Sequence, residues 1–281
     1  MPGMTSGRIA FLGGGQMGRA LIGALMRAGT PAAFISVGEP DATCRQTLLT
    51  DFGVRAVADN VAAVAGAEIV LLAVKPQQAA NTLQPLRPAL QTVKPTLLSI
   101  AAGLKVADLS AWCGPGIEVV RAMPNRPALV GAGATGVFAA ENVSAAARAR
   151  CETLLRAAGQ VVWIDDEALM DVVTAVSGSG PAYFFLLTEA LAAAGVARGL
   201  TEDSARQLAI ATLHGAGVMA ATSDGDLARL RAEVTSKGGT TEAALRVLAR
   251  SPGLTQLVRA AVDAATERGV ELSNSSLTNS K

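Results

Sequence analysis

Short apolar runs alternate with longer stretches of helical periodicity through the first half of the chain. One run, residues 69–74, is apolar at every position, which is typical of a strand that is buried on both faces of a sheet. The alternation predicts a mostly parallel sheet covered by helices, an α/β arrangement. We expect its strands at residues 8–12, 33–37, 68–74, 95–100, 117–123, 133–138 and 160–164.

The pattern changes after about residue 164, where β-branched runs give way to stretches rich in Ala and Leu. Apolar residues in 201–223 recur at helical spacing, and Thr201 is placed to cap that helix. Similar spacing predicts helices over 226–234, 241–249 and 254–272. We therefore expect two domains, 1–164 with the sheet and 165–281 all-α. Because a small helical domain this apolar would leave faces uncovered, we expect its helices to pack against a second copy.

The composition supports a folded chain and argues against several classes of function. Half of the residues (50%) are hydrophobic and the mean hydropathy is +0.37, which is ample for a substantial core. A net charge of +1 provides no basic surface for nucleic acid. His214 is the only histidine, so His-rich metal sites and Ser/His/Asp triads are disfavoured, and we expect no metal.

The sequence also favours a cytoplasmic location. Nothing at the N-terminus resembles a secretory signal. The longest uncharged run, 172–188, is shorter than the roughly 20 apolar residues that span a bilayer, so no membrane partner is expected. Cys44, Cys113 and Cys151 are odd in number and far apart, so they form neither a CxxC unit nor a disulfide framework.

A glycine-rich turn follows the first predicted strand and opens a helical stretch. Its glycines have separate tasks in a dinucleotide-binding turn: Gly13 for the tight turn, Gly15 for close approach of a pyrophosphate, and Gly18 for contact between helix and strand. The helix start offers free N–H groups to an anion. The alternative is a plain glycine-rich turn, but its place between strand and helix favours dinucleotide binding.

Four other segments at the ends of predicted strands could contact the same cofactor. Glu39 follows the second strand and could hold the ribose 2′-hydroxyl, which favours NADH, or could be a solvated turn residue. Arg45 is the nearest cation for a 2′-phosphate, so NADPH stays open. Lys75 either lies beside the nicotinamide ribose or points into solvent, and the small residues 101–103 would let a flat ring approach. Asn125 could bind nicotinamide or substrate, or cap a turn.

Two segments of the helical half carry candidate chemistry. Residues 177–183 (SGSGPAY) interrupt a helical stretch, either as a simple kink or as a small polar pocket. The segment 234–245 (VTSKGGTTEAAL) places Gly238, Gly239, Thr240 and Thr241 at the opening of a helix, where amides and hydroxyls suit a small carboxylate. Thr240 or Thr241 would also serve as an N-cap, with Glu242 in the first turn.

Taken in order, the motifs FLGGGQMG, LAVKPQ, IAAG, RAMPNRPA, AVSGSGPAY and VTSKGGTTEAAL resemble the pyrroline-5-carboxylate reductase family over essentially the whole chain. The last three are specific to that family in combination, whereas the first is shared by very many dehydrogenases. Two positions depart from the pattern: Lys237 stands where proline is frequent and Arg126 where threonine is common. Both lie close to motif loops and could alter their mobility.

This resemblance implies a Rossmann-like N-terminal domain, a helical C-terminal domain that interlocks with a second subunit, and larger rings built from such dimers. It implies substrate contacts at Glu167, Asp224, Val234, Thr240 and Thr241. It implies that NADPH or NADH contacts Leu12, Gly13, Gly14, Gly15, Gln16, Met17, Glu39, Asn60, Ala73, Val74, Lys75, Pro76, Ala101, Ala102 and Gly103.

The implied activity is an oxidoreductase reaction of proline biosynthesis, the reduction of the cyclic imine 1-pyrroline-5-carboxylate to L-proline. The amides of 238–241 would anchor the substrate carboxylate, and the catalytic residue would be Thr241, hydrogen-bonded to the imine nitrogen. Two alternatives remain. A β-hydroxyacid-type dehydrogenase would need a catalytic lysine in the helical domain, where Lys237 is the one candidate before the terminal Lys281. A non-enzymatic dinucleotide-sensing scaffold would not require a carboxylate site.

Overall fold

The computed structural model describes residues 7–278 of the chain. Contacts divide these residues into two compact units, the first made of 7–178 and 265–278 and the second of Ser179–Ala264. The boundary that composition suggests after residue 164 marks a change of sequence character, and as a domain boundary it stays a prediction. The last turns of the chain belong with the sheet although they follow the helical region in sequence.

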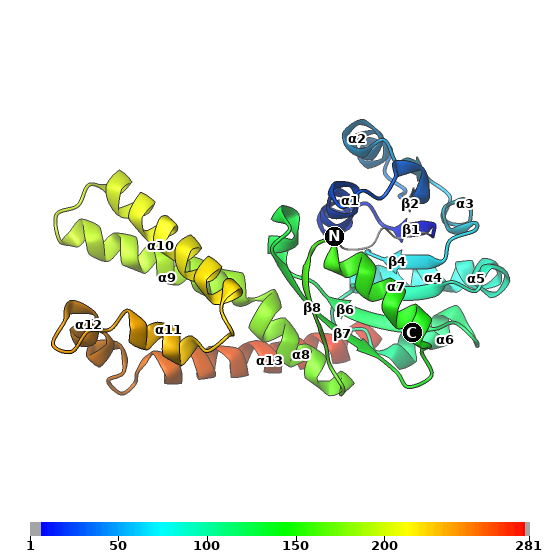
Figure 1. Cartoon of the computed structure of the whole chain (residues 1–281). Coiled ribbons are helices and arrows are strands. Elements are labelled where there is room, and N and C mark those ends of the chain that lie inside the picture. The colour runs from blue at the N-terminus through cyan, green and yellow to red at the C-terminus, as the bar shows by residue number, and fades with distance from the viewer. Residues whose placement is uncertain (1–6, 279–281) are drawn as a thin grey trace. The chain divides into compact units, whose positions relative to one another are not determined.

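An eight-stranded sheet forms the centre of the first unit, in the order β3-β2-β1-β4-β5-β6-β7-β8 (Figure 1). Strands from β3 through to β6 pair in parallel, as do β7 and β8, whereas β6 and β7 are antiparallel. The mostly parallel sheet is therefore confirmed. The strands are β1 (Ile9–Leu12), β2 (Ile35–Gly38), β3 (Arg55–Val57), β4 (Ile69–Leu72), β5 (Thr96–Ser99), β6 (Val119–Met123), β7 (Gly133–Ala139) and β8 (Gly159–Trp163).

Each predicted strand region overlaps an observed strand, and among residues 7–278 β3 is the one strand that the sequence pattern does not predict. It spans three residues, none of them fully buried, so it has no apolar run to reveal it. Its position at the outer edge of the sheet, beside β2, explains this exposure.

Helices cover both faces of the sheet, because alternate residues of each central strand enter two separate cores. In β1, Ile9 and Phe11 pack into the core that includes residues of α1, α2 and α7, whereas Ala10 and Leu12 pack into the core lined by α4, α5 and α6. The helices of this unit are α1 (Gln16–Arg27), α2 (Ala42–Phe52), α3 (Asn60–Val64), α4 (Ala79–Leu83), α5 (Arg87–Val93), α6 (Val106–Cys113), α7 (Ala145–Arg156) and α8 (Met170–Val173). Both faces being covered confirms the doubly wound α/β class.

The second unit is entirely helical. Its helices are α9 (Gly180–Ala197), α10 (Glu202–Thr222), α11 (Leu227–Glu233), α12 (Thr240–Leu248) and the start of α13 (Leu254–Thr278), which continues into the first unit. Thr201 caps α10 as predicted, its side chain accepting a hydrogen bond from the Ser204 N–H at 3.2 Å. The four helices predicted between residues 201 and 272 are thus all present, and α9 and α10 pack side by side (Figure 1).

Candidate active site

The turn between β1 and α1 requires glycine at two positions and leaves a third open. Gly13 has φ +100, and a Cβ on it would lie 2.9 Å from the carbonyl oxygen of Ala73. A Cβ on Gly18 would lie 2.8 Å from the carbonyl oxygen of Gly13. No described atom lies within 4 Å of the Cβ position of Gly15, which caps α1 without a side-chain hydrogen bond. The first turn of α1 contains no acid, so its amides can receive an anion.

Glu39 lies against this turn. Its Oε2 accepts a hydrogen bond from the Gly14 N–H at 2.8 Å, and its Oε1 accepts one from the Asp41 N–H at 3.0 Å. Arg45 is turned back onto the chain, because its Nη1 donates to the carbonyl oxygens of Glu39 and Pro40 at 2.8 and 2.7 Å. The carboxylate is thus fixed where β2 ends, while the nearby cation is occupied by backbone acceptors.

Asn60 provides an acceptor at the same place. Its Oδ1 is buried and has no hydrogen-bond partner among the described residues. A Cβ on Gly38, the last residue of β2, would lie 2.1 Å from this atom, so the glycine makes room for the amide. Burying an acceptor without a donor costs about 1–3 kcal/mol, and a bound ligand would remove that cost. The orphaned oxygen and the glycine turn both fit a dinucleotide.

The residues predicted to contact the dinucleotide from the ends of four strands lie at one edge of the sheet. β1, β2, β4 and β5 run in parallel, so their carboxyl ends meet there, and ligands bind at this edge in doubly wound folds. The predicted contacts follow these strands or begin α1 and α3, at Leu12, Gly13, Gly14, Gly15, Gln16, Met17, Gly18, Glu39, Asn60, Ala73, Val74, Lys75, Pro76, Ala101, Ala102 and Gly103. Lys75 is exposed in extended backbone, directly before the turn that Pro76 begins.

Asn125, in contrast, uses both the nitrogen and the oxygen of its side-chain amide in hydrogen bonds within the first unit. Its Nδ2 donates to the carbonyl oxygen of Ser177 at 3.0 Å, and its Oδ1 accepts from the Ala134 N–H at 2.9 Å. The residue is 8% exposed and makes no side-chain cap, so it ties the end of β6 to β7 and to the π-helical turn Thr174–Gly178. That turn overlaps the start of the break predicted over 177–183, whereas residues 180–183 are helical in α9. A cofactor contact for Asn125 stays a prediction.

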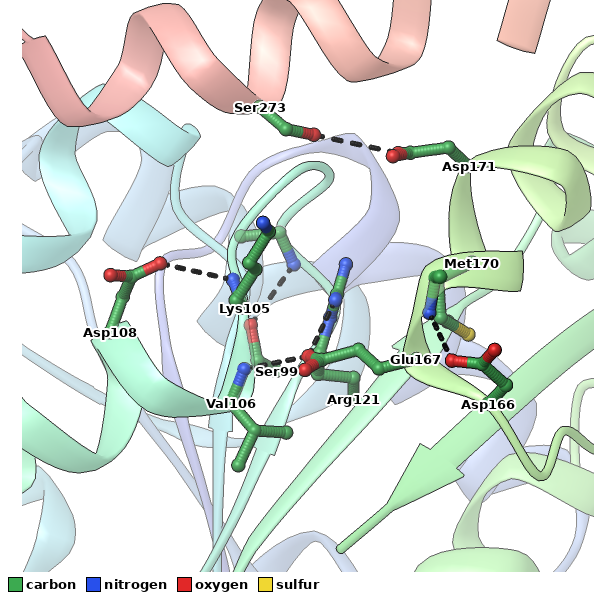
Figure 2. Close-up of polar contacts among 12 residues, drawn as sticks. Ser99, Lys105, Val106, Asp108, Arg121, Asp166, Glu167, Met170, Asp171 and Ser273 are labelled. Carbon is green, nitrogen blue, oxygen red and sulfur yellow. Dashed lines mark hydrogen bonds and ion pairs between the residues drawn. The ribbon is translucent and has the colours of Figure 1, made fainter.

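A polar cavity of about 360 Å³ lies beside Gly103 in the first unit. Glu167 Oε1 accepts hydrogen bonds there from Arg121 Nη1 at 2.6 Å and from the N–H of Val106 at 2.7 Å. Figure 2 shows the three residues together. The cavity is lined by Gly103, Lys105, Arg121, Glu167, Ala168, Asp171, Val270 and Ser273. Of these, the sequence reasoning singled out only Gly103 and Glu167. The sequence does contain one indication of Arg121, because a charged residue interrupts the apolar run of β6.

In the second unit, the loop before α12 has the open helix start that the sequence predicted. The N-cap is Gly239, one residue before Thr240, so the interpretation of Thr240 or Thr241 as N-cap is wrong, while Glu242 does lie in the first turn. Gly238, at φ +73, donates its N–H to Glu242 Oε2 at 2.8 Å. A glycine cap is possible because the Glu242 carboxylate reaches back to the loop.

Two amides of this loop remain free. Gly239 N donates to the Ser236 carbonyl oxygen at 3.0 Å, so it and Gly238 are already satisfied within the loop. Over the described part of the chain, the amides of Thr240 and Thr241 have no acceptor. Of the amides predicted to bind a carboxylate over 238–241, only those of the two threonines are therefore available. Thr241 is half-buried and Thr240 is exposed.

The remaining predicted substrate residues of this unit are exposed. Asp224 pairs with Arg229 at 2.8 Å, and the hydrogen bonds from Arg229 and from the Asp226 N–H hold the pKa of Asp224 below its usual value. Val234 ends α11 with 58% of its surface exposed. His214 is exposed on α10. Among the described residues, no group of three or more His, Cys, Asp or Glu side chains is arranged to hold a metal ion.

Comparisons with known proteins identify the family of each half of the chain. The family model described as pyrroline-5-carboxylate reductase dimerisation matches residues 167–272, and the one described as NADP oxidoreductase, coenzyme F420-dependent, matches residues 8–103. The pyrroline-5-carboxylate reductase of Pseudomonas aeruginosa is 46% identical over 96% of this chain and 98% of its own. That of Haemophilus influenzae is 41% identical over 94% of this chain and 97% of its own.

Solved structures extend the match to the fold. A pyrroline-5-carboxylate reductase from Coxiella burnetii superposes with a TM-score of 0.91 at 38% identity, covering 95% of this chain and 98% of that one. A pyrroline carboxylate reductase from Plasmodium falciparum with NADP bound gives a TM-score of 0.82 at 29% identity, over 96% of this chain and all (100%) of that one. The resemblance drawn from the motifs is confirmed.

The dimerisation match also accounts for an unusually apolar stretch. Glu167–Ala197 is, by length and composition alone, the one stretch of the described residues that is long and apolar enough to cross a membrane, and only 6% of its most apolar window is buried. It contains the predicted uncharged run 172–188 and is interrupted by the π-helical turn Thr174–Gly178. Because it lies within 167–272, its exposed apolar surface belongs to a dimerisation region.

Proposed function

The chain belongs to the pyrroline-5-carboxylate reductase family, and we propose that it reduces 1-pyrroline-5-carboxylate to L-proline with NADPH or NADH, the last step of proline biosynthesis. The observation that carries the proposal is a pair of helix starts whose N-cap is a glycine, one in each unit. The start of α1 suits the phosphates of a dinucleotide, and the start of α12 suits a small carboxylate. A dinucleotide enzyme with a carboxylate-bearing substrate needs both.

The substrate is a five-membered ring whose carboxylate and imine can be held by different groups. The amides of Thr240 and Thr241 donate to the carboxylate, and the Thr241 hydroxyl hydrogen-bonds the imine nitrogen and favours its protonated form. When bound, the reduced nicotinamide supplies the hydride that the imine carbon accepts, and the proton stays on the nitrogen of the product. The chain contributes position and exclusion of water, worth about 7–11 kcal/mol in well-oriented model reactions.

Replacement of Thr241 tests this assignment. Loss of one hydrogen bond to a charged group costs about 1.5–3 kcal/mol, so Thr241→Ala should lower kcat/KM for the imine about 10- to 150-fold. The Kd of NADH, measured by nucleotide fluorescence, should stay within about twofold because Thr241 is not among the predicted cofactor contacts. Thr241→Ser keeps the hydroxyl and is the matched control. An unchanged rate in Thr241→Ala would remove the residue from the mechanism.

We further propose that Glu39 makes NADH the preferred cofactor. The carboxylate is fixed by the N–H groups of Gly14 and Asp41, and Arg45 is held by backbone carbonyls, so a 2′-phosphate would meet a charge of its own sign. Two like charges about 4 Å apart repel by roughly 1–4 kcal/mol at the effective dielectric of a protein surface. A ribose 2′-hydroxyl, in contrast, can donate to the carboxylate.

The ratio of kcat/KM with NADH to kcat/KM with NADPH measures this preference. We expect Glu39→Gln, which keeps the shape and removes the charge, to shift the ratio toward NADPH by about tenfold or more. Glu141→Gln, at an exposed turn before α7, should leave the ratio unchanged. If Glu39→Gln also leaves it unchanged, Glu39 does not select the cofactor.

We propose a homodimer formed through the C-terminal helices, assembled into a larger ring, and a cytoplasmic location. The dimer is supported by the family match over 167–272 and by the exposed apolar side chains of the second unit. The location is supported by Cys44, Cys113 and Cys151, all of which are free thiols. Light scattering on the purified protein would give the assembly, and a dimer mass alone would exclude the ring.

A further inference from the structure

Glu167 joins three segments of the first unit through a single oxygen atom. Its Oε1 accepts from Arg121 Nη1 at 2.6 Å and from the backbone N–H of Val106 at 2.7 Å (Figure 2). Arg121 lies in β6, Val106 is the first residue of α6, and Glu167 opens the 3-10 helix Glu167–Leu169. We infer that Glu167 is a positioning residue, which holds the loop at 101–103 for the nicotinamide. This inference rests on the proposed function.

The loop in question is short and is held at both ends. β5 ends at Ser99, whose Oγ accepts from the Ala101 N–H at 3.3 Å, and α6 begins at Val106. Gly103 lies between, at φ +76, with its Cβ position 3.0 Å from Ser273 Oγ of α13. A carboxylate at the positive end of α6 therefore fixes the position where the loop enters the helix.

The partner of that carboxylate cannot turn to solvent. The Arg121 side chain is 9% exposed, whereas that of Glu167 is 26% exposed. Removal of one member of such a pair leaves a charge that is largely buried and uncompensated, so the neighbouring backbone shifts to readmit water. The backbone that this pair holds directly is the loop that precedes Val106.

Loss of the Glu167 charge should weaken binding of the nicotinamide half of the cofactor only. The phosphate and adenosine contacts are expected at the glycine turn, Glu39 and Asn60, on β1, β2 and α3, none of which Glu167 touches. A residue that positions the loop at 101–103 therefore affects NADH binding and leaves ADP-ribose binding unchanged. A substrate contact would instead alter KM for the imine, and a purely structural residue would weaken both nucleotides together.

The experiment compares the Kd of NADH and of ADP-ribose, measured by calorimetry, in the full-length wild type and Glu167→Gln. We expect the Kd of NADH to rise about fivefold or more, because Gln keeps an acceptor but loses the charge that strengthens both hydrogen bonds, with that of ADP-ribose within about twofold. In turnover, kcat should fall while KM for the imine stays within about twofold. Glu152→Gln is the matched control, since Glu152 pairs with Arg156 and Trp163 on α7 and β8, and it should change neither Kd.

Equal weakening of both nucleotides, an unchanged Kd of NADH, or a rise in KM for the imine alone would each overturn the inference. If Glu167→Gln does not fold, the paired replacement Arg121→Met with Glu167→Leu removes both charges together, and it should give the same split between nucleotides. Both Kd values are read without substrate. A wild type that binds NADH but does not reduce the imine would therefore refute the proposed function and leave this result readable.

Discussion

Buried apolar side chains are divided very unevenly between the two units. In the first unit, every residue of β1 and β4 is buried, and Phe11 and Leu71 are 0% exposed. In Ser179–Ala264 the buried residues among those described are small, namely Gly180, Ala205, Ala209 and Gly253. Large side chains are exposed there instead, Leu186 and Val247 at 67% each.

This difference shows that one unit completes its core within a single chain and the other does not. A soluble monomer rarely exposes contiguous apolar surface of this extent, and such surface marks an interaction site. The dimerisation match over 167–272 covers the unit that has the exposed side chains. The first unit is therefore expected to be stable by itself, and the second to depend on association.

The largest expected effect is at the centre of the first unit. Leu71→Ala should lower the free energy of unfolding by about 2–5 kcal/mol, because a fully buried leucine leaves a cavity. Urea unfolding followed by circular dichroism should show this loss at every protein concentration. Val61→Ala, at a side chain that is 49% exposed, should cost less than about 0.5 kcal/mol. Comparable losses in both variants would mean that the core is not where burial places it.

In the second unit, the effect of replacing an apolar side chain should depend on protein concentration, because it acts on dimer formation. Leu186→Asp puts a charge on the exposed apolar surface of α9 and should weaken dimer formation by about 2–3 kcal/mol, or 30- to 150-fold in Kd, while the first unit stays folded. Sedimentation equilibrium measures this change. Val130→Asp, at a side chain that is 79% exposed outside the dimerisation match, is the control. An unaltered dimer in Leu186→Asp would show that α9 lies outside the interface.

A smaller effect distinguishes the units by pH. Burial raises the pKa of Cys113 and of Cys151 from 9.0 to about 12. Because the folded-state pKa lies above the unfolded one, this contribution to stability is complete below about pH 9 and is lost as the pH rises toward 12. Each thiol should lower the free energy of unfolding by about 1.4 kcal/mol between pH 8 and pH 10.

Unfolding of wild type and Cys151→Ala in urea at the two pH values isolates that contribution. The variant should lose about 1.4 kcal/mol less than the wild type over this interval, since one ionising thiol is missing. The second unit contains no cysteine, so a probe of its helices should show no thiol-dependent change. An identical decline in both proteins would mean that Cys151 ionises freely in the native state.

Much of the candidate site could be predicted because its signals are local. Gly13, Gly15 and Gly18 mark a strand–turn–helix junction within six residues, and the structure has the required turn, open cap and close approach. The loop before α12 was located with equal accuracy, although its cap is Gly239. What escaped prediction is long-range: Arg121 and Glu167 are 46 residues apart, and no local spacing indicates that they pair.

By itself, the sequence determined the seven longer or more buried strands and the four helices between residues 201 and 272, because burial period and capping depend on residues a few positions apart. Only the tertiary structure decided that β7 and β8 run against the rest of the sheet, that residues 265–278 return to the first unit, and that Ser273 lies on Gly103. These pairings bring together positions far apart in the chain. Their stability comes from how whole surfaces fit, which no short window of sequence contains.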